Sequence, residues 1–251
     1  MFEGYTDQLI ATLLVSLRIA PTFSFAPPFT LMRMPVVVRL ILSLSLAFWM
    51  VQAHPGQYAH LTQPGALVSG LISELALGIA FSLGLQLAFA AMLTAGRAID
   101  FQVGFGLAVL ADPTLRTQMP LVGTFFAYAA GAVFFATNGP GDLVAIWTAS
   151  LDRIPIGGFL ANASLSVLLN YVSAIFAMGF GLAGLVIATL FLIDLAIALV
   201  SRTLPQMNVL VLGFQVKTIA MLATLPFVFA LSGAVFLRMV RAAIEVTGRL
   251  T

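Results

Sequence analysis

Long stretches without a charged residue constrain this chain more than any other feature of its sequence. Four of these stretches, each between charged positions, cover residues 75–96, 117–141, 154–193 and 218–237. A helix that crosses the hydrocarbon core of a bilayer needs about 20 apolar residues at 1.5 Å each. All four stretches meet that length. The sequence therefore predicts an all-α, polytopic membrane protein.

The composition excludes the usual soluble alternatives. Apolar residues make up 61% of the chain and charged residues 8%, with a mean hydropathy of +1.09. Ordinary soluble domains are about half apolar and about a quarter charged, so a 251-residue globule of this composition could not cover its surface against water. The net charge of +2 comes with no Lys/Arg cluster, which argues against binding to nucleic acid.

Metal, cofactor and catalytic sites are not expected. Cysteine is absent, which removes disulfides, thiolate ligands and Cys nucleophiles. The two histidines, His54 and His60, flank Pro55 and Gly56 in a polar connection that is typical of a solvated loop. No serine has a histidine at membrane depth to activate it. We therefore expect a protein without metal ligands, cofactor or catalytic residues, and not an enzyme.

Proline and glycine divide the chain into helical segments. The expected segments are 6–25, 36–53, 66–99, 120–137, 162–201 and 208–240. No polar linker is long enough to separate two soluble domains, so we expect a single membrane domain over residues 1–251.

The distribution of arginines conflicts with the number of membrane crossings that the segments suggest. Arg33 and Arg39 favour an inside loop after the first segment, and the arginines after residue 237 favour an inside C-terminus. An outside N-terminus and an inside C-terminus need an odd number of crossings, whereas six segments are counted. The stretch 154–193, about 60 Å as a helix, either breaks near Gly179–Gly181 or some segment does not cross; the sequence leaves both open.

Ionisable residues within apolar segments are costly unless they are paired or hydrated. Glu74 and Asp194 each stand alone, and either an ion relay or a buried polar anchor with a partner on another subunit would explain them. Arg97 and Asp100 are three residues apart on one helical face, where they can pair locally. For this pair we favour an anchoring role in helix and subunit packing.

Two glycine-rich stretches deserve separate interpretations. Residues 179–184 match a dinucleotide fingerprint, but they lie inside an apolar run with no strand or following acid. Close packing of helices through Gly179, Gly181 and Gly184 explains them better. The segment Gly104, Phe105, Gly106, Leu107 and Ala108 lies between helices and is apolar, which fits either a pore constriction or a buried connection.

Two motifs carry a family resemblance. One runs from Ala95 to Gly106 and on to Pro120, and the other spans Leu199–Lys217 and contains Arg202, Pro205, Gln206, Asn208 and Gly213. Both resemble the FliR family of flagellar type III export and its injectisome counterpart, SctT. The likeness covers nearly the whole chain. One departure is Gln215, which follows Gly213 and Phe214 where the family commonly has proline; another is Asp194, where flagellar members often carry asparagine.

The resemblance implies a role, a location and partners. It implies long, kinked helical hairpins packed with FliP-like and FliQ-like subunits into a helical hetero-oligomeric export gate, with an FlhB-like subunit around its base. Such a gate lies in the bacterial inner membrane at the flagellar basal body and passes unfolded flagellar proteins as export substrates. The loop matching 104–108 would be its pore plug, and residues such as Arg202, Pro205, Gln206, Asn208 and Gly213 would pack helices and subunits. Family helices also pack above the bilayer, which would explain the conflict in the number of crossings.

Two other functions remain open from the sequence. The chain could belong to the injectisome (virulence) branch of the same family. It could also be a small ion-coupled secondary transporter that uses Glu74 and Asp194 as coupling sites.

Overall fold

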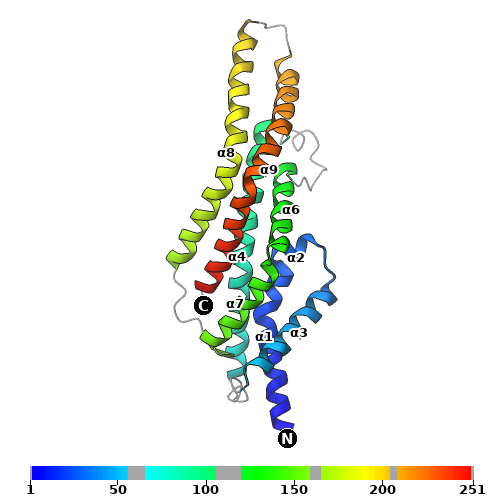
Figure 1. Cartoon of the computed structure of the whole chain (residues 1–251), viewed down its shortest axis with the longest axis vertical. Coiled ribbons are helices and arrows are strands. Elements are labelled where there is room, and N and C mark those ends of the chain that lie inside the picture. Colours follow the sequence, from blue (N-terminus) through cyan, green and yellow to red (C-terminus); the bar gives the residue numbers. More distant parts are fainter. Residues whose placement is uncertain (1, 56–65, 106–119, 159–164, 204–207, 250–251) are drawn as a thin grey trace. The chain divides into compact units, whose positions relative to one another are not determined.

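The computed structural model describes residues 2–55, 66–105, 120–158, 165–203 and 208–249. Within these ranges every regular element is a helix, which confirms the all-α prediction. The helices are α1 (Phe2–Phe25), α2 (Pro27–Leu31), α3 (Val36–Ala53), α4 (Ala66–Val103), α6 (Leu121–Ala136), α7 (Gly139–Arg153), α8 (Leu165–Thr203) and α9 (Val209–Arg249) (Figure 1).

The sequence did not predict α2 or α7, and α7 is the longer of the two. The run from Asn138 to Gly141 was interpreted as a boundary only, whereas it both ends α6 and begins α7. Asn138 takes a left-handed conformation with φ 63°, and Pro140 lies in the first turn of α7. Proline suits that position because its missing N–H has no partner inside the helix anyway. α6 and α7 meet at a bend of 69°.

The long helices continue where a break was considered. α8 runs unbroken for 39 residues through Gly179–Gly181, so a break at that point is wrong. In the described parts of the chain, five helices are long and apolar enough to cross a membrane, or six if α6 and α7 form one bent span. Five satisfies the odd number that the charge distribution requires, whereas six does not.

By its internal packing the chain divides into two compact units, and the single-domain expectation stays a prediction. Unit 1 comprises residues 1–88, 134–172 and 240–251. In it α3 packs against α1 (Figure 1). The buried core around them includes Ile19, Met50, Phe81 and Trp147. At Gly78 the helices approach closely, because a Cβ there would overlap the carbonyl oxygen of Leu17.

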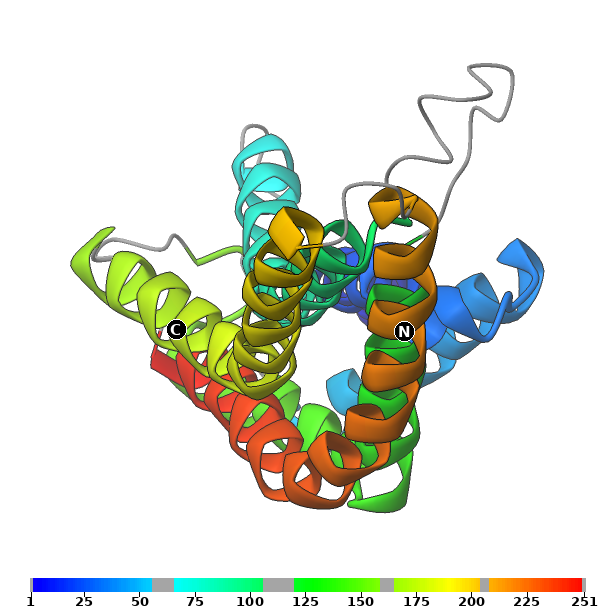
Figure 2. The same cartoon turned by 90° about the horizontal axis from the view of Figure 1, so that it is seen from above.

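Unit 2 comprises residues 89–133 and 173–239. Here α4 and α6 touch through glycines, since a Cβ on Gly96 would overlap the backbone of Gly123. Phe229 of α9 lies 4.3 Å from Phe125 of α6 between ring centroids. The stretches of α8 around residue 182 and of α9 around residue 232 run side by side in both views (Figures 1 and 2).

Candidate functional site

A fully buried ion pair lies in unit 1. The guanidinium of Arg18 on α1 donates from Nε to Oε2 of Glu74 on α4 at 2.6 Å, and from Nη2 to Oε1 at 2.7 Å. Both side chains have an exposed fraction of 0%. This two-pronged geometry is the strongest that arginine and a carboxylate can make. Glu74, which stands alone in its apolar segment of the sequence, is therefore one member of an ion pair within the same chain.

Further hydrogen bonds satisfy the same two groups. Arg18 Nη1 donates to Oγ of Ser150 at 3.0 Å, and Nη2 also donates to the carbonyl of Ile154 at 3.2 Å. The backbone N–H of Gly157 donates to Glu74 Oε1 at 2.9 Å. Since each contact comes from a different part of the chain, the network ties α1 and α4 to α7 and the turn after it.

A second polar cluster lies in unit 2 and joins three helices. Lys217 of α9 forms an ion pair with Asp194 of α8, with 2.9 Å between Nζ and Oδ1. Gln102 near the end of α4 donates to Asp194 Oδ2 at 2.9 Å, and its carbonyl accepts from Lys217 at 3.1 Å. The exposed fractions are 18% for Lys217 and 38% for Asp194. Asp194, too, has partners within the chain.

The local pair expected between Arg97 and Asp100 does not form. Arg97 is exposed. Asp100 is buried and its Oδ1 accepts from the backbone N–H of Val122 at 3.2 Å, in the first turn of α6. A carboxylate at a helix N-terminus is favoured by the helix dipole and by the free N–H groups there. Asp100 thus positions α6, a role that sequence spacing alone did not indicate.

The predicted plug begins directly after α4. Gly104 has φ 106°, a conformation that favours glycine, and its N–H donates to the carbonyl of Phe101 at 3.1 Å. The ring of Phe105 lies edge-on to that of Phe214 on α9, with 5.9 Å between centroids. Gly106, Leu107 and Ala108 lie outside the described residues, so the plug as a whole stays a prediction.

Comparison with known proteins identifies the family. The sequence model of bacterial export proteins, family 1, matches residues 9–243. The chain belongs to this family. It is 30% identical over 199 residues to the flagellar biosynthetic protein FliR of Escherichia coli (strain K12), covering 79% of this chain and 76% of the relative.

Other relatives extend the comparison. The flagellar biosynthetic protein FliR of Aquifex aeolicus (strain VF5) is 29% identical over 235 residues, covering 89% of this chain and 88% of the relative. Yop proteins translocation protein T of Yersinia pestis is 27% identical over 148 residues, covering 58% of this chain and 57% of the relative. The recognition of the FliR family from the two motifs is confirmed, and both branches of the family are among its relatives.

The packing glycines of this FliR-family chain fall into two groups. A Cβ on Gly179 would lie 3.0 Å from the carbonyl oxygen of Ala91, so α8 approaches α4 closely at this point. Gly213 is buried, with the side chain of Ile197 at 3.6 Å from such a Cβ. Gly181 and Gly184, in contrast, have nothing within 4 Å. Packing of these two against another subunit stays a prediction.

The structure describes part of the second family motif, Leu199–Lys217. Arg202 is exposed near the end of α8. Asn208 precedes α9, and its side-chain oxygen accepts from the N–H of Val211 at 3.4 Å, a weak capping bond. Pro205 and Gln206 lie outside the described residues.

The sequence analysis identified the two acids, Glu74 and Asp194, but not the residues that bind them. Arg18, Ser150, Gln102 and Lys217 complete the two clusters, and none was assigned a role. Arg18 had a usable signal, since it is the only charged residue between Asp7 and Arg33. A base in an apolar helix needs an acid at similar depth. Among the described residues no group of three His, Cys, Asp or Glu side chains is placed to hold a metal ion.

Proposed function

We propose that this chain is a non-enzymatic, pore-forming subunit of the flagellar type III protein export gate in the bacterial inner membrane, at the flagellar basal body. The observation that carries the proposal is the family match over residues 9–243. The flagellar names of relatives that align with most of the chain support the flagellar branch. The cargo would be unfolded flagellar proteins in transit.

Exposed apolar surface supports an assembly of unlike subunits. The candidate spans on α8 and α9 are each only 17% buried, compared with 56% for those on α1 and α4. Because the charges of Glu74 and Asp194 are balanced within the chain, what remains to be covered is mainly apolar. We propose that FliP-like and FliQ-like subunits cover much of it, with an FlhB-like subunit beside them and lipid over the rest.

Purification tests the assembly. Extracted in mild detergent, the tagged chain should co-purify with FliP-like and FliQ-like subunits in a fixed stoichiometry, measured by native mass spectrometry. A solitary chain that transports a small solute in liposomes would favour the secondary transporter instead. Genetic complementation distinguishes the flagellar branch of the family from the injectisome branch. Restored motility in a strain lacking its flagellar homologue supports the flagellar role, and restored secretion only in an injectisome mutant contradicts it.

The segment 104–108 is proposed as the plug of the channel. Its apolar, glycine-rich composition suits a constriction that closes by dewetting. Deletion of 104–108 in the assembled complex should produce an ion leak, measured as conductance in planar bilayers. A matched variant should replace the same five residues by Gly and Ser, which keeps the length of the loop but removes its apolar side chains. Unchanged conductance in both variants would contradict the plug while leaving the assembly intact.

A further inference from the structure

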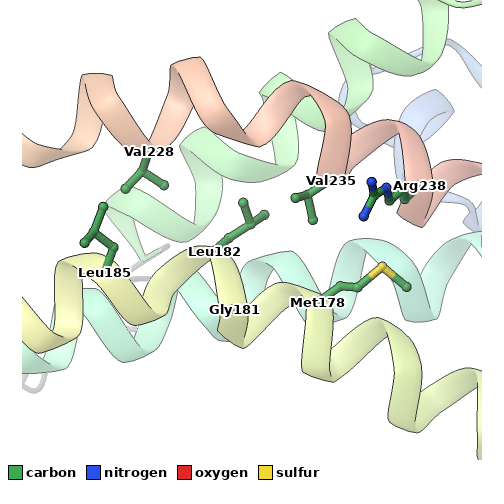
Figure 3. Close-up of a pocket in the computed structure, with 7 residues that line it drawn as sticks. All are labelled: Met178, Gly181, Leu182, Leu185, Val228, Val235 and Arg238. Atoms are coloured by element: carbon green, nitrogen blue, oxygen red, sulfur yellow. The ribbon is translucent and has the colours of Figure 1, made fainter.

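A partly open apolar groove of about 330 Å³ lies between α8 and α9 in unit 2. Its apolar lining consists of Met178, Gly181, Leu182, Leu185, Val228 and Val235, and Arg238 completes it. Figure 3 shows Leu185 and Val228 at one end of the groove, and Met178 and Arg238 at the other. Gly181 leaves a gap on the α8 side, because no atom lies within 4 Å of the place where its Cβ would be.

Among the described residues that line the groove, Arg238 is the only charged one. Its side chain is exposed, and it makes no ion pair or side-chain hydrogen bond within the parts of the chain that the structure describes. Lys217, on the same helix, is paired with Asp194. An exposed guanidinium at the end of an apolar groove can bind an anion whose remainder is apolar.

The groove has the length and the depth of one lipid leaflet. From Val228 to Arg238 the helix rises about 15 Å, half of the roughly 30 Å hydrocarbon layer. Val228 lies inside the candidate span Val211–Ala230. Arg238 is the first charged residue after the uncharged stretch 218–237 and lies eight positions beyond Ala230. If the membrane segment of α9 ends with the uncharged stretch at residue 237, Val228 lies at acyl-chain depth and Arg238 at the headgroup boundary.

We propose that this groove binds an anionic phospholipid, with one acyl chain along α8 and α9 and the phosphate on Arg238. Arginine binds phosphate through two parallel hydrogen bonds, and basic pockets between membrane helices select anionic headgroups. A zwitterionic lipid brings its own positive charge close to the guanidinium and binds less tightly. The site depends on the membrane location of α8 and α9, and not on the export role.

The test uses the whole complex, reconstituted with phosphatidylglycerol or phosphatidylcholine and analysed by native mass spectrometry for lipid that stays bound. Arg238→Ala should lower phosphatidylglycerol retention about tenfold, the equivalent of one lost charge-assisted contact, and abolish the preference over phosphatidylcholine. Arg241→Ala is the matched control, since Arg241 is on the same helix but does not line the groove. It should retain both the lipid and the preference.

A second pair of variants tests the groove itself. Gly181→Phe should fill it and displace the acyl chain, whereas Gly184→Phe adds the same bulk to α8, also in open space, outside the groove. Loss of the lipid in the first variant only, at equal complex yield, supports the site. Equal retention in the wild type and in Arg238→Ala overturns it. A photo-crosslinker at Val235 that captures a subunit helix in place of lipid would also overturn it, by showing that protein fills the groove.

Discussion

Two ion pairs between described residues, Arg18–Glu74 and Lys217–Asp194, have similar chemistry in very different surroundings. In unit 1, Arg18 and Glu74 are fully buried and are further satisfied by Ser150, Ile154 and Gly157. In unit 2, Lys217 and Asp194 are partly exposed, and Gln102 is the one further partner they share among the described residues. A buried pair with all its hydrogen bonds fixes one arrangement of the helices, whereas a half-exposed pair can separate because water can replace either partner.

Some glycines differ in a similar way, although unit 2 also contains a close glycine contact at Gly96. In unit 1, Gly78 touches the backbone of α1 so closely that no side chain fits. In unit 2, Gly181 and Gly184 face open space, and the candidate spans on α8 and α9 are mostly uncovered. Unit 1 is thus closely packed around Gly78, although its α3 is only 22% buried, while this part of unit 2 presents surface for lipid or neighbouring subunits.

The largest effect is expected at the buried pair. Arg18→Met leaves the Glu74 carboxylate buried without its partner, which should lower the free energy of unfolding by about 3–5 kcal/mol. Thermal unfolding of the purified complex in detergent, followed by circular dichroism, measures the loss. The double variant Arg18→Met with Glu74→Leu should recover much of the stability, because no uncompensated charge remains. A single variant as stable as the wild type would show that the pair does not fix unit 1.

A smaller effect is expected at the glycines. Gly78→Ala forces α4 away from α1 and should cost about 1–3 kcal/mol, as overpacked cores do. Gly184→Ala meets no atom within 4 Å, so it should leave the stability unchanged or raise it by up to about 1 kcal/mol. Comparison of the two melting curves checks the contrast between the units. Equal destabilisation by both substitutions would contradict it.

The smallest effect is expected at the partly exposed pair. Lys217→Met should lower the stability by about 0.2–1 kcal/mol, the usual range for pairs that water can reach. The loss should shrink further at high salt, because screening weakens exposed pairs first. Denaturation at low and high ionic strength measures both, with Lys217→Arg as the variant that keeps the charge. A loss as large as that of Arg18→Met would remove the distinction between the two clusters.

Much of the fold follows from hydropathy and from the proline and glycine residues between the helical segments. The bounds of α3 agree with the expected 36–53, and α4 and α8 begin and end within a few residues of their expected positions. Hydropathy failed at α7, where Asp142, Asp152 and Arg153 dilute the apolar pattern and the glycines suggested only a boundary. The expected segment also ended too early, near residue 240, whereas α9 continues to Arg249.

The sequence by itself determined that this chain is an all-α membrane protein of the FliR family, since the uncharged stretches and the two motifs are local patterns. Only the tertiary structure decided the partners of the charged residues. Glu74 meets Arg18 across 56 positions and Gln102 meets Asp194 across 92. The tertiary structure also assigned Asp100 to the N-terminus of α6 and not to Arg97. The reason is physical. The spacing of residues in an apolar helix determines which of them share a face, but a charge on that face is neutralised by the helix that packs beside it. Local spacing does not predict which helix that is.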